Sequence, residues 1–172
     1  NFMTDWLNEA YRLCRPGAPI CLFIDWRQLP SMTDALQRSG WIWRGIAVWD
    51  KVTCRPQKGR FRQQAEFIVW GSKEGMPLQR NVGCLPGVFR YTNPANAGRI
   101  HVTEKSLPLM RDIVQICEPG GRILDPFAGA GTTILAAVRE GYEAVGIEKT
   151  AVYYKLGSDR VKFALAAGEK AK

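Results

Sequence analysis

Residues 122–133 place a carboxylate and closely spaced glycines directly after a short apolar run, a combination that can bind a ligand. The apolar part of this stretch predicts a buried parallel strand. Gly129 and Gly131 let the backbone turn sharply and leave room for a ligand to touch it. Thr132 then opens a helix-forming run. Strand, glycine loop and helix N-terminus in this order direct free backbone N–H groups at a bound ligand.

A second carboxylate, Glu148, ends the next predicted strand at residues 143–148. In a strand–helix–strand unit, an acid at that strand end can accept hydrogen bonds from both hydroxyls of a ribose. The two strands and the glycine loop therefore predict a pocket for a cofactor that contains a nucleoside.

The spacing of the glycines disfavours two classes of nucleoside cofactor. The dinucleotide fingerprint G-x-G-x-x-G requires a third glycine, and this chain has Ile134 at that position. The chain also lacks the G-x-x-x-x-G-K-[ST] sequence that cradles a triphosphate. A nicotinamide-dependent oxidoreductase is therefore the weakest of the functions that the pocket leaves open.

The elements that must position this pocket follow from the apolar periodicity of the chain. A helix is expected from Thr4, its N-cap, to Leu13. Residues 19–24 form a solid apolar run, which predicts a central parallel strand that ends at Asp25. Gly157 is expected to weaken the last helix, at residues 151–167, because glycine has a low helix propensity. Further helices are expected at residues 29–38, 104–117 and 151–167, and further strands at residues 41–49 and 66–71. Helices that alternate with strands predict an α/β fold around a doubly wound, mostly parallel sheet.

The amino-acid composition is ordinary for a globular protein, but the charge is strongly positive. The 172 residues are 46% apolar and 23% charged, and the formal net charge is +8. This charge suits a polyanionic partner such as nucleic acid. The sequence contains no run of about 18 apolar residues and no secretion signal, so neither a membrane nor export is indicated. The scattered cysteines predict reduced thiols in a cytoplasmic protein without a metal site: Cys14, Cys21, Cys54, Cys84 and Cys117.

The connector between the strands at residues 41–49 and 66–71 carries five basic residues and no acid. Two interpretations are open, a solvated loop that keeps the protein in solution and a loop that binds nucleic-acid phosphates. Lys and Arg side chains neutralise backbone phosphates without reading base sequence. The candidate phosphate-binding residues are Arg55, Lys58, Arg60 and Arg62.

Residues 75–100 are rich in Gly, Pro and Asn and have little periodicity. A loop of this length in a compact domain is commonly functional, and the alternative is a mobile surface loop without a partner. Its side chains include several that read base edges in duplex DNA, among them Arg80 and Arg90. These two residues are further candidates for DNA contacts.

The stretch from Asp125 to Thr133, Asp-Pro-Phe-Ala-Gly-Ala-Gly-Thr-Thr, resembles the cofactor motif of amino-group DNA methyltransferases, which bind S-adenosylmethionine. Upstream, residues 101–110 resemble the His-Pro-Thr-Glu-Lys-Pro segment of that family. They depart from it at Val102 and Ser106, where the family usually has prolines. The resemblance covers nearly the whole chain and indicates the permuted subgroup, in which the cofactor motif comes last.

This resemblance implies a doubly wound sheet of the S-adenosylmethionine-dependent methyltransferase type that lacks its N-terminal strands. It implies S-adenosylmethionine as the methyl donor, double-stranded DNA as the partner and an exocyclic base amine as the acceptor, with adenine N6 preferred over cytosine N4. It also implies one methyltransferase domain, in which residues 1–74 belong to the catalytic half, residues 75–100 form the target-recognition loop and residues 101–172 form the cofactor-binding half. Whether the protein is a homodimer stays open.

The resemblance assigns roles to residues that match the family motifs. Glu148 is expected to hold the ribose, and Thr103 and Lys105 are expected to flank the pocket. The residues expected to line the methionine and sulfonium part of the cofactor are Asp125, Phe127, Gly129, Gly131 and Thr132.

The family's catalytic motif, Asp/Asn/Ser-Pro-Pro-Tyr, does not occur in this sequence. In the family this motif holds the flipped base and its amine, so the catalytic residues are unknown here. We expect the motif to lie upstream of residue 1 in a longer parent, on a strand between those at residues 19–24 and 122–125. The alternative is a non-catalytic module that binds S-adenosylmethionine or DNA without transferring a methyl group.

Overall fold

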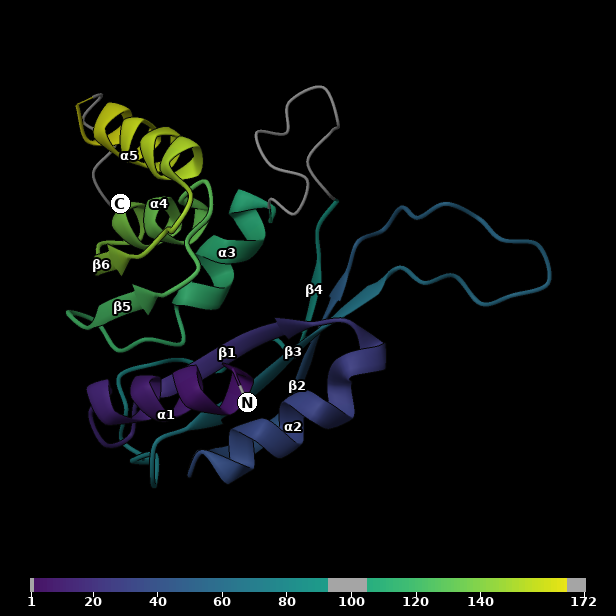
Figure 1. The fold of residues 1–172 in the computed structure, drawn as a ribbon, viewed down its shortest axis with the longest axis horizontal. Coiled ribbons are helices and arrows are strands. Elements are labelled where there is room, and N and C mark those ends of the chain that lie inside the picture. Colours follow the sequence, from purple (N-terminus) through teal and green to yellow (C-terminus); the bar gives the residue numbers. More distant parts are fainter. Residues whose placement is uncertain (1, 93–104, 167–172) are drawn as a thin grey trace. The chain divides into compact units, whose positions relative to one another are not determined.

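The computed structural model describes residues 2–92 and 105–166, and the chain divides into two compact units. Unit 1 comprises Asn1–Arg80 and Pro86–Arg90, and unit 2 comprises Asn81–Leu85 and Tyr91–Lys172. Each unit has a sheet of its own with its own helices (Figure 1). Among the described residues, no helix has the length and apolar character needed to cross a membrane.

Unit 1 is a mixed four-stranded sheet in the order β1-β3-β2-β4. The central strands β2 and β3 pair antiparallel, β1 pairs antiparallel with β3, and β4 lies parallel to β2. Two helices, α1 and α2, pack on the sheet. The elements in chain order are α1 (Phe2–Leu13), β1 (Pro19–Ile24), the 3-10 helix η1 (Trp26–Gln28), α2 (Leu29–Arg38), β2 (Ile42–Asp50), β3 (Ala65–Ser72) and β4 (Val88–Arg90).

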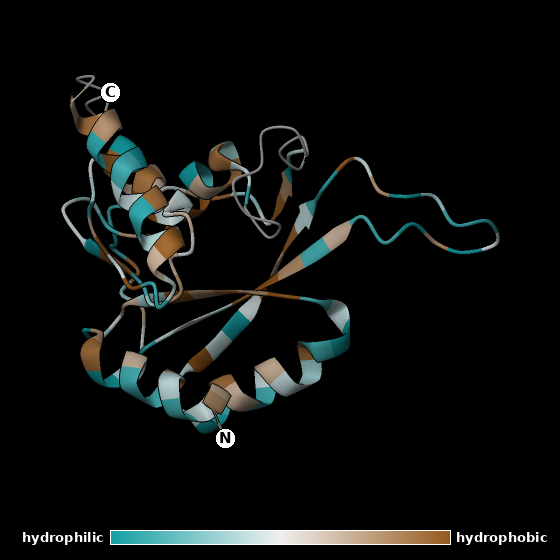
Figure 2. Cartoon of the chain, turned by 45° about the horizontal axis from the view of Figure 1, so that its top comes forward, coloured by the Kyte–Doolittle hydropathy of each residue, from teal (hydrophilic) through white to brown (hydrophobic). Residues whose placement is uncertain are grey.

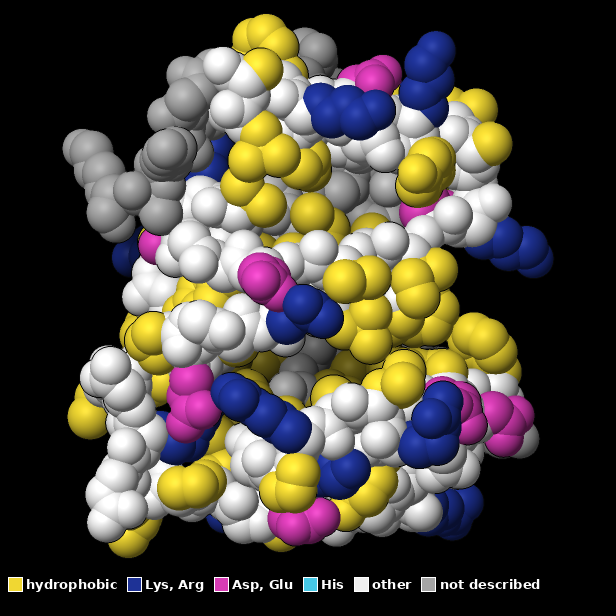
Figure 3. Space-filling model, turned by 90° about the vertical axis from the view of Figure 1, so that its left-hand side faces the viewer, with side chains coloured by type: hydrophobic (Ala, Val, Ile, Leu, Met, Phe, Trp, Pro, Cys, Tyr) yellow, Lys and Arg dark blue, Asp and Glu magenta, His cyan; other side chains and the backbone are white. Residues whose placement is uncertain are grey.

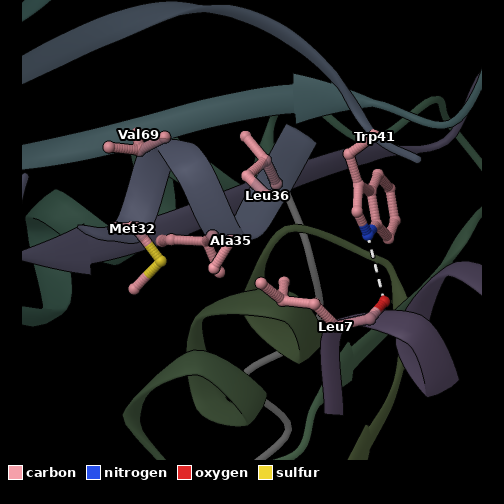
Figure 4. Packing of buried hydrophobic residues seen from close by; sticks show 7 residues of the cluster. Leu7, Met32, Ala35, Leu36, Trp41 and Val69 are labelled. Atoms are coloured by element: carbon pink, nitrogen blue, oxygen red, sulfur yellow. Dashed lines mark hydrogen bonds between the residues drawn. The ribbon is translucent and has the colours of Figure 1, made fainter. Parts of the chain in front are cut away.

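The core of unit 1 lies between these two helices and the sheet (Figure 4). Leu7 of α1 and Leu36 of α2 are fully buried, as is Val69 of β3. The Trp41 indole donates a hydrogen bond to the Leu7 carbonyl at 3.1 Å, which satisfies its polar atom inside the core. Gly71 allows close approach at the sheet, because a Cβ atom there would lie 2.6 Å from the Ile42 carbonyl oxygen.

Unit 2 is built on a pair of parallel strands, β5 (Arg122–Asp125) and β6 (Glu143–Gly146). The helix α4 (Thr132–Arg139) connects them and packs on α3 (Leu107–Val114). A third helix, α5 (Ala151–Ala166), follows β6 and also contacts α4. The hydropathy colouring shows both apolar and polar residues along these helices (Figure 2).

The α/β class expected from the sequence is confirmed, and the helix at residues 29–38 has the predicted bounds. The expectation that the strand at residues 19–24 pairs in parallel is wrong within the described residues. The strand β1 pairs antiparallel with β3 and lies at the edge of its sheet. A solid apolar run indicates burial but not strand order, which is decided by the partners that lie far away in the sequence.

Other expectations about individual elements also differ from the structure. The strand expected at residues 143–148 ends at Gly146, so Glu148 lies two residues beyond β6. Thr4 is not an N-cap, because α1 begins at Phe2 and the half-buried Met3 packs against the core ahead of it. The segment at 75–100, expected to lack regular structure, contains β4, whose Phe89 is buried. The helix expected at 104–117 is shorter, with Pro108 in its first turn.

Candidate functional site

The carboxyl ends of β5 and β6 meet at one edge of their sheet, because the two strands are parallel. Two hydrogen bonds extend this pairing beyond the strands. The Ile147 N–H donates to the Asp125 carbonyl, and the Ala128 N–H donates to the Ile147 carbonyl, both at 2.9 Å. The chain that follows Asp125, residues 126–131, is therefore held against the end of β6, and we call it the glycine loop.

The side chain of Asp125 shapes the start of the glycine loop. Its Oδ1 atom accepts a hydrogen bond from the Phe127 N–H at 3.0 Å, an arrangement that turns the backbone at Pro126. Within the described residues, its Oδ2 atom accepts no hydrogen bond. One carboxylate oxygen thus fixes the turn, and the other can receive a donor from a ligand.

Glu148 links the glycine loop to the segment after β6. Its Oε2 atom accepts a hydrogen bond from the Gly129 N–H at 2.9 Å, and its Oε1 atom accepts one from the Thr150 N–H at 2.7 Å. The Gly129 N–H is therefore occupied by Glu148, whereas the sequence predicted that it would point at a ligand. A carboxylate offers about four acceptor positions, so these two bonds do not exhaust its capacity.

The two glycines of the loop have different physical reasons for being glycine. Both have positive φ angles, 52° at Gly129 and 76° at Gly131. A Cβ atom at Gly131 would lie 3.1 Å from the Cα atom of Gly157, so this position is limited by packing against α5. A Cβ atom at Gly129 would meet no atom within 4 Å. Gly129 thus borders open space, in which a ligand can approach the backbone.

The helix α5 supports the loop through two residues that sequence reasoning did not select. Gly157, interpreted from sequence as a weak spot, is buried and lets α5 approach the backbone of Ala130 and Gly131. The Arg160 Nη1 atom donates a hydrogen bond to the Ala130 carbonyl at 2.8 Å. The glycine in a helix interior was the available signal, because such a residue commonly marks a close packing contact.

Phe127 and Thr132 have contrasting environments. Thr132 is buried as the first residue of α4, directly after Gly131 at the N-cap position. Phe127 is 54% exposed and is not a core residue. It belongs to a group of exposed apolar residues on β5 and β6 and directly after them: Leu124, Phe127, Val145 and Ile147. Figure 3 shows that hydrophobic side chains reach the surface on this side of the molecule.

The two flanking residues are less defined. Lys105 is half-buried and precedes Ser106, the N-cap of α3. Thr103 lies outside the described residues. The structure thus brings together Asp125, Phe127, Gly129, Gly131, Thr132 and Glu148 in unit 2.

The predicted phosphate-binding residues lie in unit 1, in the connector between β2 and β3. This connector, residues 51–64, has no regular secondary structure and extends away from the sheet as a long arm (Figure 1). Its side chains Arg55, Lys58, Arg60 and Arg62 are all exposed, and none has a hydrogen bond or an ion pair with another described residue. The arm therefore presents four uncompensated positive charges to solvent.

The other two candidate DNA contacts lie elsewhere in unit 1. Arg90 belongs to β4, and its Nε atom lies 3.5 Å from the Oδ2 atom of Asp50, which is next to the arm. Arg80 is half-buried after β3. Both remain candidates, but among the six candidate DNA contacts only Arg55, Lys58, Arg60 and Arg62 have no protein partner in the part of the chain that the structure describes.

The chain is similar in sequence to known methylases. The family model for DNA methylases, N6_N4_Mtase, matches residues 1–93 and 84–159 of the chain. YubD of Escherichia coli (strain K12), which bears the name of a methylase, is 28% identical over 163 residues, covering 91% of this chain and 69% of the relative. The type II methyltransferase M2.MboI of Moraxella bovis is 25% identical, covering 93% of this chain and 64% of the relative. The chain thus spans about two thirds of the length of these curated relatives.

A solved structure is also similar to the chain. The crystal structure of an M1.HpyAVI–SAM complex has a TM-score of 0.78 and 26% sequence identity, covering 92% of this chain and 81% of the solved chain. That solved structure is a complex with SAM.

Proposed function

Because the chain belongs to the DNA methylase family of the N6/N4 class, we propose that its glycine loop binds S-adenosylmethionine for methylation of an exocyclic amine in duplex DNA. The observation that carries this proposal is the open space at Gly129 beside Glu148. A nucleoside can enter there, close to the backbone and next to a carboxylate. The likeness to M1.HpyAVI, which was crystallised with SAM, supports the choice of cofactor.

Residues of the glycine loop and around it have separate roles in this proposal. Glu148 accepts hydrogen bonds from the ribose hydroxyls in addition to those from Gly129 and Thr150. Asp125 presents its Oδ2 atom to the ammonium group of the methionine part. Phe127 contributes an apolar surface beside the cofactor. Gly131 and Thr132 direct the first turn of α4 at the pocket, and Thr103 and Lys105 flank it.

When bound, the cofactor supplies a methyl group on a sulfonium sulfur, which a base nitrogen can displace. The loop residues hold this group in place, and such positioning is a large part of the rate of a bimolecular transfer. The acceptor is an exocyclic amine, with adenine N6 preferred over cytosine N4.

Duplex DNA is the partner that the charge of the chain supports. The four exposed basic side chains of the arm can neutralise phosphates, which gives affinity without base recognition. Arg80 and Arg90 are proposed to add contacts near the target. In this proposal the arm binds DNA and the glycine loop binds the cofactor.

A second candidate function is binding without methyl transfer. The observation that favours it is the absence of the Pro-Pro-Tyr motif from these 172 residues. This second candidate binds S-adenosylmethionine, DNA or both, so binding alone does not separate it from the first. They differ in turnover, which a radiolabelled methyl-transfer assay on genomic DNA measures directly.

The experiment that tests the proposed cofactor is a calorimetric titration of the 172-residue chain with S-adenosylmethionine, with NAD as the control ligand. We expect saturable binding of S-adenosylmethionine and no heat with NAD. Equal binding of both ligands would favour a dinucleotide site, and no binding by a chain with a folded circular dichroism spectrum would refute the pocket.

A further inference from the structure

Phe61 is an aromatic side chain that the fold leaves almost entirely in water. It is 98% exposed, although a phenyl ring is among the side chains that gain most free energy when removed from water. It follows the turn at residues 58–60, at the far end of the arm. Its position therefore needs an explanation other than packing within this chain.

The residues next to Phe61 are basic on both sides. Arg60 and Arg62 flank it directly, and Lys58 precedes them across Gly59, whose φ angle is 71°. The arm contains no acidic residue between positions 51 and 64. An apolar ring between two cations matches a base step of nucleic acid, in which stacked bases lie between phosphates.

The root of the arm is braced, in contrast to its tip. The Asp50 Oδ1 atom accepts hydrogen bonds from the Val52 N–H at 2.8 Å and from the Gln64 Nε2 atom at 2.9 Å. The Lys51 Nζ atom lies 3.0 Å from Glu66 and 5.5 Å from the centroid of the Trp49 ring. These contacts fix the direction in which the arm leaves the sheet.

Beyond this root, the arm contains a turn at residues 58–60 but no helix and no strand pairing. Residues 54–63 make no backbone hydrogen bond with any other residue that the structure describes. Each side of the arm spans about six residues, so an extended arm reaches on the order of 20 Å from the sheet. Figure 2 shows the arm extending away from the strands of unit 1. A reach of this order is sufficient to enter a groove of a DNA duplex.

We propose that Phe61 is a wedge that inserts between neighbouring base pairs of duplex DNA while Arg60 and Arg62 contact the flanking phosphates. This inference rests on the proposed function and adds to it a residue that opens the base stack. Proteins that kink a duplex insert apolar side chains between base steps, and their cations offset the cost of unstacking. An enzyme that modifies a base amine needs such unstacking, because the base must leave the helix to be reached.

The test measures fluorescence anisotropy of the full chain with two labelled duplexes, one fully paired and one with a single mismatch. A wedge prefers the mismatched duplex, because unstacking costs less there. Phe61→Ala should reduce this preference about ten-fold, and Phe61→Trp should keep it, since both rings stack on bases. A 2-aminopurine base next to the mismatch should brighten with the native chain and remain dim with Phe61→Ala.

Two controls separate the wedge from other effects. Phe163→Ala removes an exposed phenyl ring from α5, in the other unit, and should leave the mismatch preference unchanged. Arg60→Gln with Arg62→Gln should lower the salt slope by about 2 and retain the preference for the mismatch. Phe61→Ala should leave the salt slope as it is.

The outcomes distinguish this inference from the proposed function. Salt-dependent DNA binding with an unchanged mismatch preference in Phe61→Ala would overturn the wedge and leave DNA binding intact. Failure of the native chain to bind either duplex would overturn both. A change of sedimentation coefficient in Phe61→Ala, without a change in DNA binding, would assign the ring to self-association and overturn the wedge.

Discussion

Glu148 connects the shape of the glycine loop to the proposed recognition of the cofactor. Its two oxygens hold Gly129 and Thr150, and a carboxylate has the capacity to accept further hydrogen bonds from ribose hydroxyls. The same carboxylate therefore orders the loop and binds the ligand. Removing it should impair both.

We predict that Glu148→Ala weakens binding of S-adenosylmethionine by about 1–3 kcal/mol, the usual value for lost charged hydrogen bonds. Calorimetric titration measures the change. Glu143→Ala is the matched control, because Glu143 lies at the opposite end of β6 in an exposed ion pair with Arg122. Unchanged affinity in Glu148→Ala would refute the ribose role.

The two loop glycines lead to a second prediction at this scale. Asn tolerates the left-handed backbone that Gly129 adopts, so Gly129→Asn should introduce little strain. The Asn side chain should occupy the space into which the ligand would bind. Gly131→Ala should instead force the loop from Gly157 and destabilise the fold by about 1–3 kcal/mol. We expect cofactor binding to be lost in the first variant at a native melting temperature. The second should melt at a lower temperature, and the opposite pattern would contradict the assignment of open space to Gly129.

At the scale of elements, the basic side chains of the arm between β2 and β3 do not contribute to the stability of the fold. Its exposed basic side chains have no partner in the described chain, so their removal leaves no buried group unpaired. The strand pairing and the contacts at the root continue to hold the sheet without them. Their effect should therefore appear in DNA binding alone.

Replacing Arg55, Lys58, Arg60 and Arg62 by Gln should lower DNA affinity and reduce the slope of log affinity against log salt by about 3 to 4, since each phosphate contact contributes about 0.9. Fluorescence anisotropy across a salt series measures this slope. The control variant removes the same number of charges from exposed positions off the arm: Arg12, Arg38, Arg122 and Lys162. Equal slopes in the two variants would mean that the arm only contributes net charge.

A side-chain hydrogen bond joins the segment after β4 to α3, and a stability prediction follows from it. The Tyr91 hydroxyl donates this bond to the Asp112 Oδ2 atom, which raises the pKa of Tyr91. Tyr91→Phe should lower the free energy of unfolding by about 1 kcal/mol in chemical denaturation. The raised pKa stabilises the protonated form, so this contribution is complete below pH about 10 and is lost as the pH rises through the pKa of the folded state. Equal stability of the two proteins at pH 7 would show that the bond contributes nothing.

At the scale of the whole molecule, the two units carry different proposed ligands. The glycine loop and its supporting helix belong to unit 2, and the arm belongs to unit 1. The strands β1 and β5, which the family resemblance places on either side of the catalytic-motif strand, are each at the edge of their own sheet. Within the described residues, no strand joins the two sheets.

Amide hydrogen exchange should show that the two ligands protect different units of the chain. S-adenosylmethionine should slow exchange in residues 125–150 and leave the arm unchanged, because a ligand protects the amides that it orders or covers. Duplex DNA should slow exchange in residues 51–64. Protection of the arm by the cofactor alone would contradict this division.

The family, the α/β class and the positions of most elements could be predicted from the sequence, because they depend on residues close together in the chain. Helical periodicity located α2, and the closely spaced glycines between Asp125 and Thr132 located the loop. The link between the loop and Glu148 was also predictable, since a strand–helix–strand unit brings the two strand ends together.

Contacts between distant residues were decided only by the tertiary structure. The apolar run at residues 19–24 has the same composition in a central or an edge strand, so its antiparallel pairing at the sheet edge could not be predicted. Gly157 is unfavourable in an isolated helix but necessary where the loop packs against it, and the bracing of the arm by Asp50 depends on a contact with Gln64, 14 residues away. A local pattern records what a residue prefers, whereas burial and contact depend on which distant segments the fold places beside it.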